Sequence, residues 1–152
     1  MLIIEYLSKS YQHFLHDLPQ FASRKSRFVV TLNGATESEL STASKDIARV
    51  TENNVQLSTA ITEQLSEFDI TALFSAARSS RDILLFDKAD LLFEKKTALK
   101  RAHERNTGFD LNNLFKNIAK HNGIVILAPE KMHTLSASMS TKVDVLIRFP
   151  TV

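Results

Sequence analysis

The chain has 152 residues, of which 43% are hydrophobic and 24% charged, and its formal net charge is +2. This length corresponds to one domain with a proper core, and the small net charge argues against nucleic acid as the partner. No apolar run approaches the roughly 18 residues that a membrane span requires. The N-terminus lacks a signal-peptide pattern and the sequence contains no cysteine, so we expect a cytoplasmic protein without disulfides.

The first expected element is an amphipathic helix over residues 1–24. We expect Pro19 to end or bend this helix. The apolar residues that recur at helical spacing are Ile3, Ile4, Leu7, Tyr11, Phe14, Leu15 and Leu18. His13 and His16, with Asp17 next to them, lie at an i, i+3 spacing that can bind metal. No third ligand is identifiable beyond this group, so we interpret the two histidines as surface residues and expect no metal.

Strands and helices alternate after residue 24. The five runs that we expect to form strands are 27–32, 54–59, 82–87, 123–128 and 143–149. Helical periodicity lies between them, and Thr36 to Glu39 has the pattern of a capping box. Nearly uniform apolar strands that alternate with helices predict a parallel sheet covered on both faces. We therefore expect a three-layer α/β/α core over residues 25–152, with a five-stranded parallel sheet.

One long segment resembles a known family. DILLFDKADLLFEKKTALKRAHERNTGFDLNNLFKNIAKHNGIVILA, residues 82–128, resembles the AAA+ ATPase segment from the Walker B strand to the sensor-1 strand. AHERNTGFDLNNLF is the most specific part, because the likeness includes polar residues. Over residues 25–150 the likeness is one of topology. It implies a P-loop NTPase fold with ligands at the carboxyl ends of the strands, here without the lid subdomain that usually follows the core.

The resemblance implies a phosphate-binding loop after the first core strand, but the residues there differ from the family pattern. A P-loop uses glycine-rich backbone, a lysine and a hydroxyl group. Residues 33–39 contain one glycine and no lysine, and they carry Glu37 and Glu39. Like charges about 4 Å apart repel by roughly 1 to 4 kcal/mol, so these acids oppose a bound phosphate. We interpret the segment as a plain capped helix start.

Three further family positions are altered. Asp87 matches the magnesium-binding acid of Walker B, but Lys88 replaces the carboxylate that polarises the attacking water. Ala128-Pro129-Glu130 replaces the usual polar sensor, and residues 141–144 contain no arginine finger. Together with the loop, these changes predict that catalysis has been abandoned and that no cofactor is held. Asp87 is then a vestigial Walker B position.

Lys88 and Glu130 have opposite charges and are expected at neighbouring strand ends. We hypothesise that the two side chains pair across the vacant site and fill the space that a nucleotide would need. The alternative is that both point to solvent and contribute almost nothing to stability.

The resulting prediction is a catalytically inactive AAA+-like domain that acts through a protein partner, either an active AAA+ ATPase or a second copy of itself. Aromatic residues of the first helix pack on the sheet or belong partly to such an interface. A first alternative is weak nucleotide binding through Asp87 and the helix end, with slow hydrolysis at most. A second is nucleic-acid binding through Arg24, Lys25 and Arg27 and through the basic residues of 95–101. We rank it last because acids interrupt the second cluster.

Overall fold

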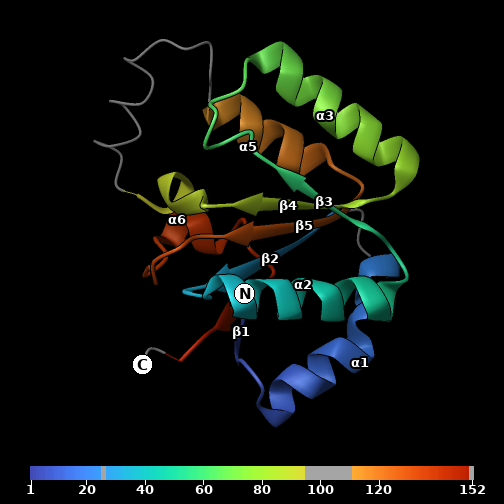
Figure 1. The fold of residues 1–152 in the computed structure, drawn as a ribbon, viewed down its shortest axis with the longest axis vertical. Helices are drawn as coiled ribbons and strands as arrows, with labels where there is room; N and C mark the ends of the chain where they lie inside the picture. Colours follow the sequence, from blue (N-terminus) through green and yellow to red (C-terminus); the bar gives the residue numbers. More distant parts are fainter. Residues whose placement is uncertain (25–26, 95–110, 151–152) are drawn as a thin grey trace.

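The computed structural model describes residues 1–24, 27–94 and 111–150. In this part of the chain a six-stranded sheet lies between two layers of helices (Figure 1). The strands are β1 (Leu2–Glu5), β2 (Arg27–Asn33), β3 (Val55–Ser58), β4 (Ile83–Asp87), β5 (Gly123–Ala128) and β6 (Val145–Arg148). Their order is β1-β6-β2-β5-β4-β3, and every pairing is parallel. The expected α/β/α fold is confirmed, with six described strands where the sequence predicted five.

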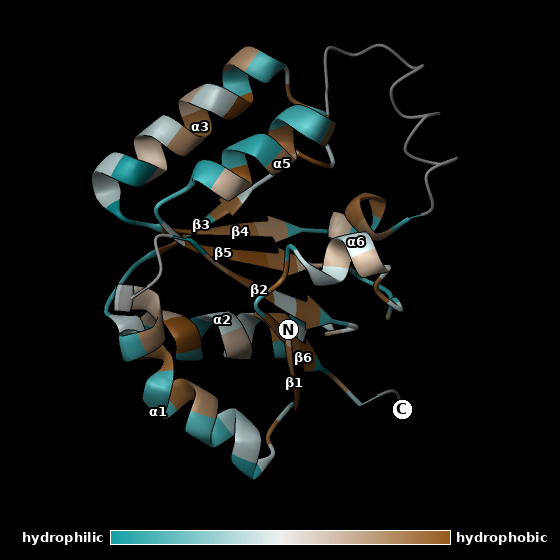
Figure 2. Ribbon diagram, turned by 180° about the vertical axis from the view of Figure 1, so that it is seen from behind, coloured by the Kyte–Doolittle hydropathy of each residue, from teal (hydrophilic) through white to brown (hydrophobic). Residues whose placement is uncertain are grey.

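In the described part of the chain, helices cover both faces of the sheet, two on each (Figures 1 and 2). The helices on one face are α1 (Lys9–Arg24) and α2 (Glu37–Thr51), and those on the other are α3 (Glu67–Ser80) and α5 (Leu111–Lys120). The reason lies in the strands, whose side chains alternate between the faces. In β2, for example, Val30 belongs to the core under α1 and α2, whereas Val29 belongs to the core under α3 and α5.

The expected N-terminal helix is wrong over its first residues. Residues 2–5 form strand β1, which pairs with β6 at the edge of the sheet, and α1 begins only at Lys9. Ile4 is buried and lies in register with Ile147. A short apolar run fits both the strand and the helix period, and only the free edge of β6 decided between them.

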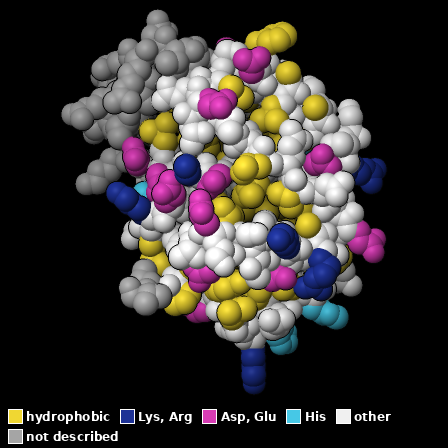
Figure 3. Space-filling model, viewed as in Figure 1, with side chains coloured by type: hydrophobic (Ala, Val, Ile, Leu, Met, Phe, Trp, Pro, Cys, Tyr) yellow, Lys and Arg dark blue, Asp and Glu magenta, His cyan; other side chains and the backbone are white. Residues whose placement is uncertain are grey.

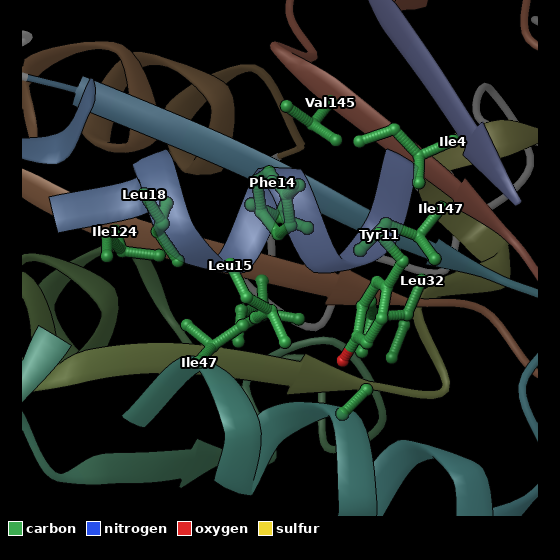
Figure 4. Close-up of a cluster of buried hydrophobic side chains, with 14 of the residues drawn as sticks. Ile4, Tyr11, Phe14, Leu15, Leu18, Leu32, Ile47, Ile124, Val145 and Ile147 are labelled. Carbon is green, nitrogen blue, oxygen red and sulfur yellow. The ribbon is translucent and has the colours of Figure 1, made fainter. Parts of the chain in front are cut away.

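Pro19 does not end α1, as one of the two expectations had it, but lies inside the helix. The helix continues because its apolar face continues to pack, with Leu15 and Leu18 buried before and beside the proline. Figure 4 shows these side chains among strand residues and Ile47 of α2. The N-terminal helix thus shares one core with α2 and the sheet.

Tyr11 joins α1 to α2 by a partly buried hydrogen bond. Its side chain is fully buried, and its hydroxyl donates to Oδ2 of Asp46 over 2.9 Å. Burial, and then this hydrogen bond, raise the pKa of Tyr11 above its usual value, so the phenol stays protonated.

The described helices include none that is long and apolar enough to span a bilayer.

His121 makes the stability of this fold depend on pH. The side chain is buried next to Phe74, and neither ring nitrogen has a hydrogen-bond partner. Burial, assisted by the positive charge of Arg78, lowers the pKa of His121. The folded state therefore binds this proton less readily than the unfolded state, and stability is lost as the pH falls below the unfolded value of about 6.5.

We predict that acidification from pH 7.5 to 5.5 lowers the melting temperature and that His121→Leu removes much of this dependence. The lost stability grows by at most about 1.4 kcal/mol per pH unit. Thermal unfolding followed by circular dichroism measures it. His16→Gln, on the exposed face of α1, is the matched control and leaves the dependence unchanged. Equal pH dependence in wild type and His121→Leu would contradict the assignment.

Candidate functional site at the carboxyl edge of the sheet

The carboxyl ends of the parallel strands bring three family positions to one edge of the sheet. Asn33 ends β2, Asp87 ends β4 and Ala128 ends β5. β5 lies between β2 and β4, and Asp87 is in register with Ala128. The short helices η1 (Ala89–Phe93) and α6 (Ala137–Ser140) also belong to this region. This is the edge at which open α/β sheets bind ligands.

The loop after β2 is closed by atoms of the protein. Gly34 has a left-handed backbone with φ of 82°, and a Cβ placed on it would lie 3.2 Å from Cβ of Met132. Met132 comes from the loop after β5, so residues far apart in sequence meet here. Met132, which is 44% exposed, therefore lies against Gly34 at the start of the loop that would be the P-loop.

The N-terminus of α2 is also satisfied internally. Thr36 caps the helix, and its Oγ1 accepts the N–H of Glu39 over 3.2 Å. Oε1 of Glu39 accepts the N–H of Thr36 over 3.0 Å. The capping box expected from the sequence is confirmed. Two of the amide groups at this helix end, those of Thr36 and Glu39, are therefore paired with side-chain oxygens, one of them a carboxylate.

Asn33 holds the loop after β5 by two hydrogen bonds to one residue. Its side chain is buried, with 2% of the residue exposed. Nδ2 donates to the carbonyl of His133 over 2.8 Å, and Oδ1 accepts the N–H of His133 over 2.9 Å. The amide thus matches both backbone groups of His133 and fixes the loop against the end of β2.

Asp90 of η1 holds the same loop from the opposite side. Its carboxylate accepts the N–H of Glu130 over 2.9 Å and that of Lys131 over 3.1 Å. Oδ1 also lies 2.7 Å from Nε2 of His133. We name these contacts, together with those of Asn33, the Asp90–His133–Asn33 clamp. Residues 129–133 are consequently held between β2 and η1, with Met132 against Gly34.

The clamp changes the acidity of Asp90. Burial alone raises its pKa, but the hydrogen bonds from His133 and from the two backbone N–H groups outweigh burial and lower the pKa below its usual value. The Phe93 ring stacks on His133 with ring centroids 5.6 Å apart, which limits the orientations of the imidazole. The arrangement is thus a charged, partly buried hydrogen-bond network.

Asp87 and Lys88 make only local contacts in the described structure. Oδ1 of Asp87 accepts the N–H of Lys88 over 2.8 Å, and Asp87 is partly exposed. Lys88 has a left-handed backbone with φ of 52°, and its side chain is exposed. These two residues therefore retain their places at the end of β4 without joining the clamp.

The expected pair of Lys88 and Glu130 is not present in the structure. Both residues are exposed, and no hydrogen bond or ion pair joins these two described side chains. Glu130 contributes its backbone N–H to the site, where the carboxylate of Asp90 accepts it.

Sequence reasoning missed Asp90, His133 and Asn33. Asp90 and His133 are 43 positions apart, and Asn33 and His133 are 100 positions apart. The available signal was an acid in an otherwise apolar segment, ADLLF, and a polar residue that ends a buried strand. Neither signal identifies its partner.

Acidic residues predominate around this edge. Glu37, Glu39, Asp87, Asp90 and Glu130 lie on the elements that meet here, against Lys88 and Lys131. Figure 3 shows acidic side chains gathered on the left of the molecule, where Figure 1 places this edge. Nevertheless, no group of three or more potential metal ligands is found among the described residues.

Part of the expected site cannot be placed. Residues 102–110 of AHERNTGFDLNNLF and the basic residues Lys25, Lys95, Lys96, Lys100 and Arg101 lie outside the described residues. The end of this motif, from Leu111 onwards, is the start of α5.

The clamp predicts a specific effect of Asp90→Asn. The amide cannot accept all three hydrogen bonds, so we expect a loss of about 1 to 3 kcal/mol in the free energy of unfolding. The amides of Glu130 and Lys131 should then exchange hydrogen faster. Urea unfolding and hydrogen exchange measure the two effects. Asp87→Asn is the matched control, because that carboxylate accepts only a local N–H.

The pH dependence of this effect follows from the lowered pKa of Asp90. Its contribution is complete above the unfolded value of about 3.9 and is lost as the pH falls through the lower folded value. Wild type and Asp90→Asn should therefore converge in strongly acidic solution. Unchanged protection of Glu130 and Lys131 in the variant would contradict the clamp.

Comparison with solved structures shows the same fold in ATPase domains. The FIGL-1 AAA domain in complex with ADP superposes with a TM-score of 0.62 at 16% identity, over 94% of this chain and 53% of that one. A structure describing katanin self-assembly gives 0.55 at 18% identity, over 93% and 50%. The Escherichia coli MS115-1 HORMA:CdnC:Trip13 complex gives 0.52 at 16% identity, over 94% and 60%.

This chain spans about half the length of these proteins, or slightly more. No curated protein matches it. The model of the family described as "ATPase family associated with various cellular activities (AAA)" matches residues 31–151, which is most of the chain. With the strand order and the family positions at the carboxyl edge, this match leads to one conclusion: the chain belongs to the AAA family.

Proposed function

We propose that this AAA domain does not hydrolyse ATP and acts through contacts with a protein partner. The observation that carries the proposal is the closure of the β2–α2 loop, in which Met132 packs on Gly34. A phosphate that approached the Gly34 backbone would have to displace this side chain.

Displacement of Met132 requires movement of a loop that is held on both sides. The Asp90–His133–Asn33 clamp contains five hydrogen bonds, three to the Asp90 carboxylate and two to Asn33. At about 1 kcal/mol each, and more for bonds to a charged group, opening the clamp costs on the order of 5 kcal/mol. Such a cost weakens nucleotide binding by more than about a thousandfold.

The residues at the site provide few groups that would bind a nucleotide. The loop has no lysine to neutralise a phosphate, and Glu39 is committed to the helix cap. Asp87 remains as a single carboxylate for magnesium, which is normally held with the help of a P-loop hydroxyl and the phosphates themselves. Lys88 stands in the place of the carboxylate that would polarise the attacking water, so this carboxylate is missing from the site.

The partner-binding part of the proposal is supported by two of the matched structures. The matched structures include a katanin structure that concerns self-assembly and a Trip13 chain within a HORMA:CdnC complex. Those proteins act within protein assemblies, and we extend this property, without the ATPase reaction, to the present chain. The alternative is weak nucleotide binding, for which the partly exposed Asp87 carboxylate is the supporting observation.

We predict that millimolar ATP and magnesium leave the melting temperature of the protein unchanged. A ligand at a hundred times its dissociation constant would stabilise the fold by about 2.7 kcal/mol, which is readily measured as a rise in melting temperature. Phosphate release in the same solution should equal that of buffer alone.

A magnesium-dependent rise in melting temperature that disappears in Asp87→Ala would overturn the proposal and favour the weak-binding alternative. Asp82→Ala is the matched control, since Asp82 precedes β4 at the opposite end of the strand. The melting temperature of Asp82→Ala should respond to ATP in the same way as that of the wild type.

A further inference from the structure

Exposed hydrophobic side chains concentrate around β1 and α1. Eight large hydrophobic residues are exposed in the described part of the chain, and five of them lie within the first 21 residues. They are Met1, Leu2, Ile3, Leu7 and Phe21, and the exposed fraction reaches 53% for Leu2 and Ile3 and 67% for Leu7. Exposed apolar patches of this kind mark interaction surfaces.

The backbone of β1 is open on one side. Among the described strands, β1 is the last of the sheet and pairs with β6 alone. The N–H groups of Leu2 and Tyr6 donate to carbonyls of Asp144 and Arg148, over 3.0 and 2.9 Å. Because backbone groups alternate in direction along a strand, those of Ile3 point to the open side. An open edge with apolar side chains is a template for another strand.

A groove follows this edge between β1 and α1. It is a pocket of about 410 Å³ with Leu2, Ile3 and Phe21 among its apolar residues, and with Lys9, His13 and Asp17 along α1. A second pocket of about 560 Å³ shares Leu2 and Phe21 with it. The two hollows therefore form one continuous apolar surface around β1. In Figure 3, hydrophobic, basic and histidine side chains lie together at the lower end, where Figure 1 places α1.

The order of charges along the groove of one copy is complementary to that of a second copy turned by 180°. Lys9, His13 and Asp17 follow one another at intervals of four residues, so α1 presents a positive, a titratable and a negative side chain in order. Lys9 and Asp17 are separated by about 12 Å along the helix. A second copy turned by 180° presents the reverse order and so places its Asp17 opposite Lys9, and its Lys9 opposite Asp17. The pattern thus has the self-complementarity that a two-fold interface between copies requires, and this favours a second copy as the partner.

We propose that two copies of this chain form a two-fold symmetric dimer. Their β1 edges pair antiparallel near Ile3, and the α1 helices lie antiparallel beside each other on the same face of the joined sheet. Two Lys9–Asp17 ion pairs then form across the axis, with the two His13 side chains between them. This names the partner in the protein-contact part of the proposed function and does not depend on the absence of nucleotide binding.

Sedimentation velocity of the purified protein tests the dimer. Wild type should sediment as a dimer, and Ile3→Lys, which places a charge at the centre of the strand pair, should sediment as a monomer. Lys9→Glu and Asp17→Lys each turn two attractive contacts into repulsive ones, so each should weaken dimerisation at least about tenfold. The double variant Lys9→Glu/Asp17→Lys restores opposite charges and should regain the wild-type dimer.

Lys45→Glu is the matched control for charge. Lys45 is exposed on α2 and does not line the groove, so its reversal should leave the dimer unchanged. Circular dichroism confirms that each variant is folded, which is expected because Ile3, Lys9 and Lys45 are exposed.

A wild-type monomer at about 100 μM, where a micromolar dimer would be almost complete, would overturn the proposal. So would a dimer or larger assembly that Ile3→Lys and the charge exchange leave unchanged, because its interface would lie elsewhere. The two proposals can fail separately. A monomer whose melting temperature does not change with ATP would contradict only the dimer. A dimer that binds ATP would contradict only the proposed loss of nucleotide binding.

Discussion

The burial of both faces of a parallel sheet is the constraint on which the rest of this structure depends. β2, β4 and β5 are buried along nearly their whole length, and each needs side chains above and below to exclude water. Two helices on each face supply them, and the connections between parallel strands return the chain through these helices. The same constraint makes the strands end together at one edge, so it also places every residue of the candidate site.

At that edge the structure uses polar groups to close the site. At the start of α2, side-chain oxygens of Thr36 and Glu39 accept the backbone N–H groups of each other's residue. The loop after β5 is held by Asp90 and Asn33, which accept or donate five hydrogen bonds between them. Buried polar groups must be paired, and this loop is the partner that satisfies them without a ligand.

At the side of the sheet that β1 forms, hydrogen-bonding groups are left open. There β1 ends the sheet with an open backbone, and the exposed side chains of Leu2, Ile3 and Leu7 are apolar. The polar groups at the carboxyl edge are thus hydrogen-bonded within the domain, whereas the outer side of β1 has no partner strand among the described residues. This difference is the reason why we propose contacts with a second copy and not chemistry at the carboxyl edge.

The sequence by itself determined the elements whose signal is local. Uniform apolar runs predicted the five core strands, and the Thr36–Glu39 pattern predicted a capping box that the structure contains. The family likeness in residues 82–128 predicted the fold and the edge at which the site lies. These features could be predicted because hydrophobic period and capping depend on residues within one or two turns of each other.

Only the tertiary structure decided the rest. Residues 2–5 became a strand because β6 offered a free edge, although their spacing also fits a helix. Asp90 found its partners in a loop 40 to 43 positions away, and Glu130 contributed a backbone group where a side-chain pair with Lys88 was expected. The physical reason is that a polar group takes whichever partner the folded loops bring within hydrogen-bond distance, and sequence spacing does not contain that distance.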